Sequence, residues 1–134
     1  MTGRVLALDH GSARCGCAVS DPSGTLATPL SAVARPDEEA GLNAVAALVA
    51  EREVERIVVG LPITLAGDEG EQARAARAFA DSLGGRVDVP VEMYDERLTT
   101  RMAERSGVGG AADADSRAAA HLLGSWLAAQ GQRA

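Results

Sequence analysis

The sequence predicts an α/β fold in which a mixed five-stranded sheet carries helices on both faces. The chain opens with a continuous apolar run, Arg4–Asp9, which is typical of a central strand covered on both sides. Two further strand-like segments follow after short turns, so the first three strands should form an antiparallel meander. Beyond Pro36, helix-like and strand-like segments alternate, which adds two crossover strands to the sheet.

Turn residues delimit these strands. Gly11 and Ser12 lie in a turn before the second strand, and Asp21-Pro22-Ser23-Gly24 is a typical turn sequence after it. Pro29 cannot donate a ladder hydrogen bond, which restricts the third strand to a sheet edge or a bulge. The expected strands are Arg4–Asp9, Cys15–Ser20, Thr25–Ala34, Arg56–Gly60 and Pro90–Tyr94.

The helices are predicted from the spacing of their apolar residues and from their end signals. The first opens at Pro36-Asp37, and the second follows the polar turn Gly67–Gly70 and stops at Gly84-Gly85. A short helix should begin at Thr99 or Thr100, because threonine caps a helix well, and end before Gly107. A final helix should run from about Asp115 to Gln130, which gives the order β-β-β-α-β-α-β-α-α.

Length and composition point to one cytoplasmic domain spanning residues 1–134. A chain of 134 residues can bury a core without disulfides, and no apolar run approaches the roughly 20 residues that a membrane span needs. The apolar stretch before Asp9 is too short for the core of a signal peptide. Cys15 and Cys17 share one face of a strand and should pack as buried thiols rather than bind zinc.

The charge is acidic, at −6, and all 13 basic residues are arginines. This balance argues against loose, non-specific polyanion binding, which depends on many neutralised phosphates. A nuclease remains compatible with it, since bound divalent cations offset local acid charge and guanidinium groups grip phosphate in a bidentate way.

Carboxylates follow two of the predicted strands at their carboxyl ends, where loops of an open sheet converge. Asp9 ends the first strand, and Asp95 and Glu96 end the fifth. A carboxylate directly after a buried strand is partly dehydrated, which is costly unless a cation compensates it. Taken alone, Asp9 would more simply be a cap of the following turn, as aspartate often is.

Asp115 adds a third acid with an unusual direction. On the final helix it shares the apolar, sheet-facing side with Ala119, Leu122 and Trp126, at spacings of 4, 3 and 4 residues. Capping of the helix would not require this inward direction. Three such acids would repel one another if they met without a cation, and oxygen ligands suit Mg²⁺ or Mn²⁺. We therefore expect a metal-dependent phosphodiester hydrolase.

Four segments of the chain carry motif-like sequences in a fixed order. They span nearly the whole chain, and only their combination is specific. The first runs from Leu8-Asp9-His10-Gly11 through Arg14-Cys15-Gly16 to Asp21, and the second is Val59-Gly60-Leu61-Pro62 with Gly67. The third is Asp95-Glu96-Arg97-Leu98-Thr99-Thr100, and the fourth is Asp115-Ser116-Arg117-Ala118-Ala119 with Leu122-Leu123 and Trp126-Leu127. In this order they resemble the motifs of the YqgF family, the RuvX-like and resolvase-like nucleases of pre-16S ribosomal RNA maturation.

The resemblance implies a ribonuclease H-like fold with Asp9, Glu96 and Asp115 as an acidic, metal-binding and catalytic triad. It also implies trimming of the 5′ end of the 16S rRNA precursor, or alternatively resolution of branched DNA such as a Holliday junction. Arg14, Arg97 and Thr99 fall on or beside motif positions and are candidates for binding substrate. The alternative role of the two arginines is a salt bridge, to Asp21 or Asp95. His10 and Cys15 depart from the first motif, and Arg105–Ala114 is short and Gly/Ala-rich where a basic stretch is expected.

Two other functions stay open at this stage. The segment Asp9-His10-Gly11-Ser12 could be the phosphate loop of an actin-like or sugar-kinase-like ATPase, although such enzymes need two copies of the fold. The acidic composition and the missing basic stretch favour instead a non-catalytic ribosome-assembly factor that binds RNA or protein. An exposed alanine-rich helix could support a homodimer, but no feature specifies one.

Overall fold

The computed structural model describes residues 3–64, 66–98 and 114–133. Its strands are β1 (Arg4–Asp9), β2 (Arg14–Ser20), β3 (Ala27–Ala34), β4 (Val54–Leu61) and β5 (Val91–Asp95). Its helices are α1 (Glu39–Glu51), α2 (Glu71–Gly84), the 3₁₀ turn η1 (Glu96–Leu98) and α4 (Ala114–Arg133). This order confirms the predicted alternation, while the short helix expected from Thr99 or Thr100 lies outside the described residues.

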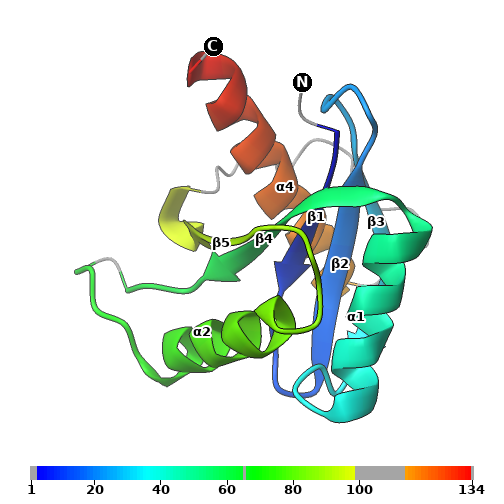
Figure 1. Ribbon diagram of the computed structural model, residues 1–134. Helices are drawn as coiled ribbons and strands as arrows, with labels where there is room; N and C mark the ends of the chain where they lie inside the picture. Colours follow the sequence, from blue (N-terminus) through cyan, green and yellow to red (C-terminus); the bar gives the residue numbers. More distant parts are fainter. Residues whose placement is uncertain (1–2, 65, 99–113, 134) are drawn as a thin grey trace.

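The five strands form one mixed sheet in the order β3-β2-β1-β4-β5, as Figure 1 shows. The pairs β1–β2 and β2–β3 are antiparallel, whereas β1–β4 and β4–β5 are parallel. The first three strands therefore form the predicted meander, and the two crossover strands extend it beyond β1. Pro29 lies in β3 at the edge of the sheet, where its missing N–H leaves no ladder bond broken.

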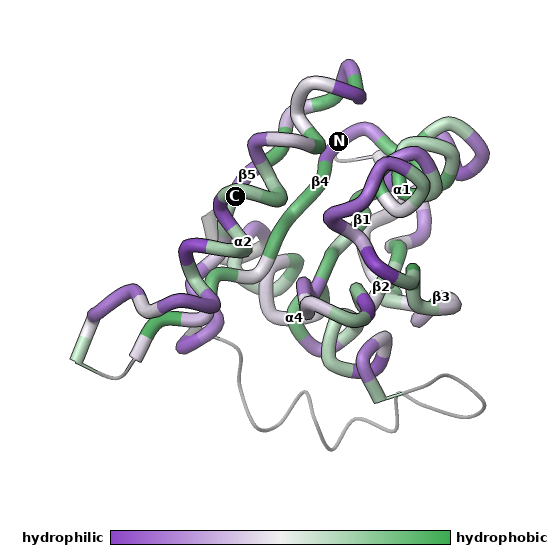
Figure 2. Tube along the Cα trace, turned by 90° about the horizontal axis from the view of Figure 1, so that it is seen from below, coloured by the Kyte–Doolittle hydropathy of each residue, from purple (hydrophilic) through white to green (hydrophobic). Residues whose placement is uncertain are grey.

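Helices cover both faces of the sheet because β1 and β4 are apolar on both sides. One face packs against α1 and α2 through Leu6, Leu8, Val59 and Phe79, all fully or almost fully buried. The other packs against α4 through Val5, Ala7, Val58 and Leu123. Figure 2 shows the hydrophobic colour running along β4 at the centre of the molecule. Burial on both faces explains why these strands read as continuous apolar runs.

Several boundaries differ from the prediction, and the local turn structure explains two of the differences. β3 begins at Ala27 rather than Thr25, because the Asp21 carboxylate accepts hydrogen bonds from the backbone N–H groups of Thr25 and Leu26. α1 begins at Glu39 rather than Pro36, because Arg35 has a positive φ of 46° and Glu38 is extended. Asp37 instead pairs with His10 at 3.0 Å.

Other boundaries extend the predicted elements by a few residues. β4 starts at Val54, two residues early, and α4 extends to Arg133. The two thiols are buried and unpaired, as predicted for Cys15 and Cys17. In the part of the chain that the structure describes, no helix is both long and apolar enough to cross a bilayer.

Candidate active site

The three predicted acids come from three elements that meet where β1 and β5 end, a place called the sheet edge below. Asp9 is the last residue of β1, and Glu96 directly follows β5. Asp115 lies in the first turn of α4, which packs across β1 and β2. Strand alternation places Asp9 on the same face as Val5 and Ala7, which is the face that α4 covers. The fold therefore directs all three acids toward one side of the sheet.

Asp9 and Glu96 are hydrogen-bonded to each other through their carboxyl groups. Burial raises the pKa of Asp9, and the hydrogen bond from Glu96 partly offsets that rise. Burial also raises the pKa of Glu96 to about 7, and the negative charge of Asp9 adds to the effect. Because two carboxylates this close cannot both be charged at little cost, the pair favours a state in which the two groups share one proton.

Asp115 lies close enough to raise the pKa of Asp9 through its own negative charge. Its carboxylate pairs with the guanidinium of Arg14, with Nε and Oδ2 at 3.1 Å. Both partners are open to water, with 64% of the Arg14 side chain and 39% of the Asp115 side chain exposed. Asp115 thus belongs to the same acidic cluster, but its charge is balanced by the guanidinium group of Arg14.

Two glycines in the neighbouring strands make room for this arrangement. Gly16 pairs with Asp9 across the β1–β2 ladder, and a Cβ there would lie 1.9 Å from the backbone oxygen of Asp115. Gly60 lies in β4, on the other side of β1 from β2, and a Cβ there would lie 2.5 Å from Oε2 of Glu96. Glycine inside a strand often marks a close approach of other groups. This signal was present in the sequence, but the roles of Gly16 and Gly60 were missed.

A hydrogen bond to Ser116 anchors the start of α4 on β2. The buried hydroxyl oxygen of Ser116 accepts this hydrogen bond from the backbone N–H of Cys17 at 3.2 Å. The ladder between β2 and β3 is irregular between Cys15 and Cys17, which is where this N–H is found. The bond fixes the backbone next to Asp115, and sequence reasoning had not assigned Ser116 any role.

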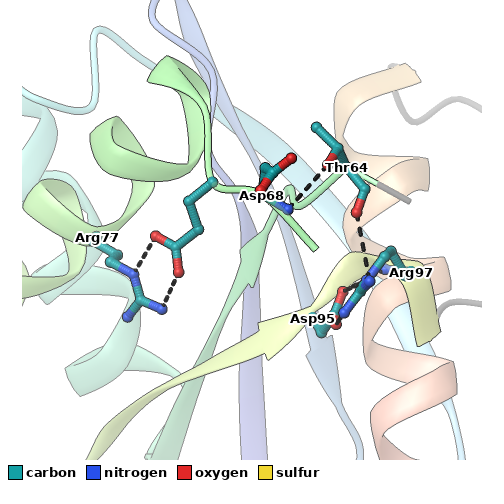
Figure 3. A network of polar contacts seen from close by, with 6 residues as sticks. Thr64, Asp68, Arg77, Asp95 and Arg97 are labelled. Carbon is teal, nitrogen blue, oxygen red and sulfur yellow. Dashed lines mark hydrogen bonds and ion pairs between the residues drawn. The ribbon is translucent and has the colours of Figure 1, made fainter. Parts of the chain in front are cut away.

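Arg97 is held at the same edge by Asp95 and the loop after β4 (Figure 3). Its guanidinium donates to both carboxylate oxygens of Asp95 at 2.7–3.1 Å and to the backbone oxygen of Thr64 at 3.5 Å. The predicted Arg97–Asp95 salt bridge is confirmed. The Arg14–Asp21 alternative is wrong, because Asp21 is engaged by its own turn and Arg14 pairs with Asp115. Thr99 lies outside the described residues.

The donor set fits a hard divalent cation. Carboxylate oxygens are the ligands that Mg²⁺ and Mn²⁺ prefer, and burial, together with the neighbouring acid charges, raises the pKa values of Asp9 and Glu96, so a bound cation would favour their charged forms. Across residues 3–98 without Leu65, and 114–133, no three His, Cys, Asp or Glu side chains are already grouped as metal ligands. The carboxyl groups of Asp9 and Glu96 contact each other, whereas the carboxylate of Asp115 is paired with Arg14.

Comparison with known proteins identifies the family. A family model described as "RuvX: Holliday junction resolvase" matches residues 3–129. The chain belongs to the RuvX family. Curated relatives carry the name "Putative pre-16S rRNA nuclease". One from Anaeromyxobacter sp. is 45% identical, and the match covers 92% of this chain and 96% of the relative. Another from Thermobifida fusca is 51% identical over 77% of this chain and 64% of the relative.

Solved structures place this RuvX-family chain in the ribonuclease H-like fold. RuvC of T. thermophilus in complex with a Holliday junction substrate superposes with a TM-score of 0.63, covering 96% of both chains at 15% identity. A second structure of Thermus thermophilus RuvC gives a TM-score of 0.57. At this identity the likeness concerns the fold alone, and it confirms the predicted fold class.

Proposed function

We propose that this protein is a divalent-metal-dependent nuclease whose cation is held by Asp9, Glu96 and Asp115. The observation that carries the proposal is the hydrogen-bonded Asp9–Glu96 pair at the sheet edge, with Asp115 close enough to act on it. Protein folds rarely gather dehydrated carboxyl groups without a compensating function, because each charge costs free energy to bury. Membership of the RuvX family supports the same assignment.

The chemistry follows from the charge of the cluster. A bound Mg²⁺ or Mn²⁺ supplies an activated water and stabilises the leaving oxygen of a phosphodiester. Before such an ion can be held, Glu96 has to release its proton, which makes both it and Asp9 anionic ligands. Arg14 and Arg97 flank the acids and are proposed to position substrate phosphates, since a guanidinium group binds phosphate through two donors. Thr99 is proposed to assist them.

We further propose that the substrate is the 5′ end of pre-16S rRNA. The name of the curated relatives supports this choice, above all that of the Anaeromyxobacter relative, which matches over nearly its full length. The description of the family model supports branched DNA as the second candidate. A single domain over residues 1–134 and a cytoplasmic location belong to the same proposal.

The test is a cleavage assay with both substrate classes. Purified protein is incubated with a 16S rRNA precursor carrying its 5′ leader, and separately with a four-way DNA junction, in Mn²⁺, Mg²⁺ or EDTA. We expect cleavage of the RNA in Mn²⁺ or Mg²⁺, none in EDTA, and a loss of at least about 100-fold in Asp9→Asn. Asp88→Asn is the matched control, because Asp88 is an exposed acid outside the cluster.

Three results would change the assignment. Cleavage that persists in EDTA or in Asp9→Asn would exclude the metal mechanism. Cleavage of the junction alone would select the branched-DNA alternative. If neither substrate is cut but the Asp9→Asn/Asp115→Asn double variant still complements a strain lacking the protein, the non-catalytic assembly factor would replace the nuclease.

A further inference from the structure

We infer that Arg14 is a displaceable counter-ion of Asp115: it competes with the divalent cation for the Asp115 carboxylate and gives that carboxylate up when the cation binds. This inference deepens the proposed function and rests on it. The observation behind it is that Asp115 is paired with Arg14 at 3.1 Å, while the other two acids are paired with each other.

Each acid of the cluster already has a partner that reduces its negative charge. Asp9 and Glu96 are paired with each other, and Asp115 has the guanidinium of Arg14. No three described side chains are yet grouped as metal ligands. If all three acids are to hold one cation, Asp115 therefore has to turn away from Arg14 toward Asp9.

The backbone around Asp115 is fixed, so this change requires only its side chain. Its backbone oxygen lies against Gly16, and the neighbouring Ser116 accepts the hydrogen bond from the N–H of Cys17. α4 itself is anchored by Leu122, Leu123 and Trp126, which are buried against the sheet. A rotation of the Asp115 side chain would exchange one partner for the other without moving the helix.

The Arg14–Asp115 pair is also exposed enough to exchange. With 64% of Arg14 and 39% of Asp115 accessible, water screens the attraction, and ion pairs of this kind are weak. Arg97 provides the contrast at the same edge. It donates to both oxygens of Asp95 and to Thr64, and its side chain is only 35% exposed. Arg14 is therefore the arginine of the two that a cation can displace.

Removal of Arg14 should tighten cation binding. We expect isothermal titration with Mn²⁺ to give about a threefold to fivefold lower Kd for Arg14→Gln than for the unmodified protein, because the competitor is gone. The matched control is Arg86→Gln. It also removes an arginine paired with a carboxylate, here Glu39, but between α1 and the segment after α2. This control should leave the Kd unchanged.

A second measurement follows Arg14 itself. In an ¹H–¹⁵N spectrum of arginine Nε–H groups, the Arg14 signal is assigned by its absence in Arg14→Gln. We expect this signal to shift as diamagnetic Mg²⁺ saturates the site, because the Nε contact to Asp115 is lost, while the Arg86 signal stays in place. A purely structural role of Arg14 would move neither the Arg14 signal nor the Mn²⁺ affinity.

The possible results separate this inference from the proposed function. If the unmodified protein binds neither Mn²⁺ nor Mg²⁺, the metal-dependent nuclease fails and this inference fails with it. If it binds either ion, but Arg14→Gln binds Mn²⁺ no more tightly, or the Arg14 signal stays unchanged at saturating Mg²⁺, the inference alone is overturned. Tighter binding in Arg14→Gln together with a shifted Arg14 signal establishes it.

Discussion

At the scale of single residues, the acidic cluster is arranged so that its charges are compensated one by one. The partly buried carboxyl groups of Asp9 and Glu96 share a proton, and Arg14 pairs with the carboxylate of Asp115. This proton makes the stability of the fold depend on pH. The pKa of Glu96 in the folded protein, about 7, lies above its ordinary value of 4.5. Between these two values the folded state binds more protons than the unfolded state, so stability falls as the pH rises through this window.

Glu96→Gln should therefore stabilise the protein in EDTA at pH 8. Glutamine has no proton to lose, and its amide can still donate to Asp9. We expect the free energy of unfolding at pH 8 to rise by roughly 1–2 kcal/mol, less than the full pKa shift implies because water partly screens this carboxyl. At pH 4.5 the difference should largely vanish. Urea denaturation at both pH values measures this.

The control for this experiment is Glu71→Gln, an exposed acid in the first turn of α2. It should not reproduce the stabilisation at pH 8. An identical loss of stability with pH in Glu96→Gln and the unmodified protein would show that Glu96 does not hold the shared proton.

The sequence allowed the acids to be predicted at this scale, but not their partners. Asp9 and Glu96 could be placed together because Asp9 ends β1, Glu96 directly follows β5, and the two strands end on the same side of the sheet. The partner of Arg14 could not be predicted, since an exposed arginine can reach several acids and its choice depends on rotamers. Asp21, the expected partner, is engaged by the N–H groups of Thr25 and Leu26.

At the scale of elements, the two strand glycines have different roles that substitution should separate. At Gly60 an added Cβ would meet Oε2 of Glu96 at 2.5 Å and Cδ2 of Leu122 at 3.1 Å, both ends of side chains that can move. Gly60→Ala should therefore displace Glu96 at little cost to folding. We expect nuclease activity to fall by about 10-fold or more, with the free energy of unfolding changed by less than about 1 kcal/mol. Activity close to that of the unmodified protein would contradict this role of Gly60.

Gly16→Ala should act mainly on the fold. Its Cβ would lie 1.9 Å from the backbone oxygen of Asp115 and 2.9 Å from the backbone nitrogen of Ser116, so the start of α4 would have to move. We expect a loss of roughly 2–4 kcal/mol in the free energy of unfolding, measured by urea denaturation. Gly84→Ala is the control, because its added Cβ would meet nothing within 4 Å beyond the adjoining residues and the backbone of its own helix. A Gly16→Ala variant as stable as this control would show that α4 can dock without the glycine.

Element types were predictable because the apolar patterns are unambiguous, whereas boundaries depended on hydrogen bonds that patterns do not contain. The continuous apolar residues of β1 indicate burial on both faces, and both faces are indeed covered. The predicted start of α1 was wrong because Pro36 suggested a first helical turn. In the structure, Arg35 has a positive φ and Asp37 pairs with His10, so these residues form a separate turn before the helix. Gly16 and Gly60 lie within the family-like motifs, but their packing role depends on how closely α4 and Glu96 approach the sheet.

At the scale of the whole molecule, one helix connects the core to the site. α4 buries Ala119, Leu122, Leu123 and Trp126 against the sheet and carries Asp115 at its start. Trp126 also donates to Glu92 of β5 at 3.0 Å, and Tyr94 of β5 is hydrogen-bonded to Ser125 at 3.0 Å. The core interactions that hold α4 in place thereby fix the distance between Asp115 and the acids on β1 and after β5.

This connection predicts that a cation should stabilise the entire fold, and more strongly at higher pH. A ligand that binds only the folded state adds stability, by about 2.7 kcal/mol at 100 times its Kd. Since Glu96, with a pKa of about 7, must release its proton to become a ligand, Mn²⁺ affinity should rise between pH 6 and pH 8. We expect Mn²⁺ at a fixed concentration to raise the Tm more at pH 8 than at pH 6. Differential scanning calorimetry with and without EDTA measures this, and Asp9→Asn should show little of the effect. A Tm increase that is equal at both pH values, or larger at pH 6, would mean that cation binding is not linked to the proton shared by Asp9 and Glu96.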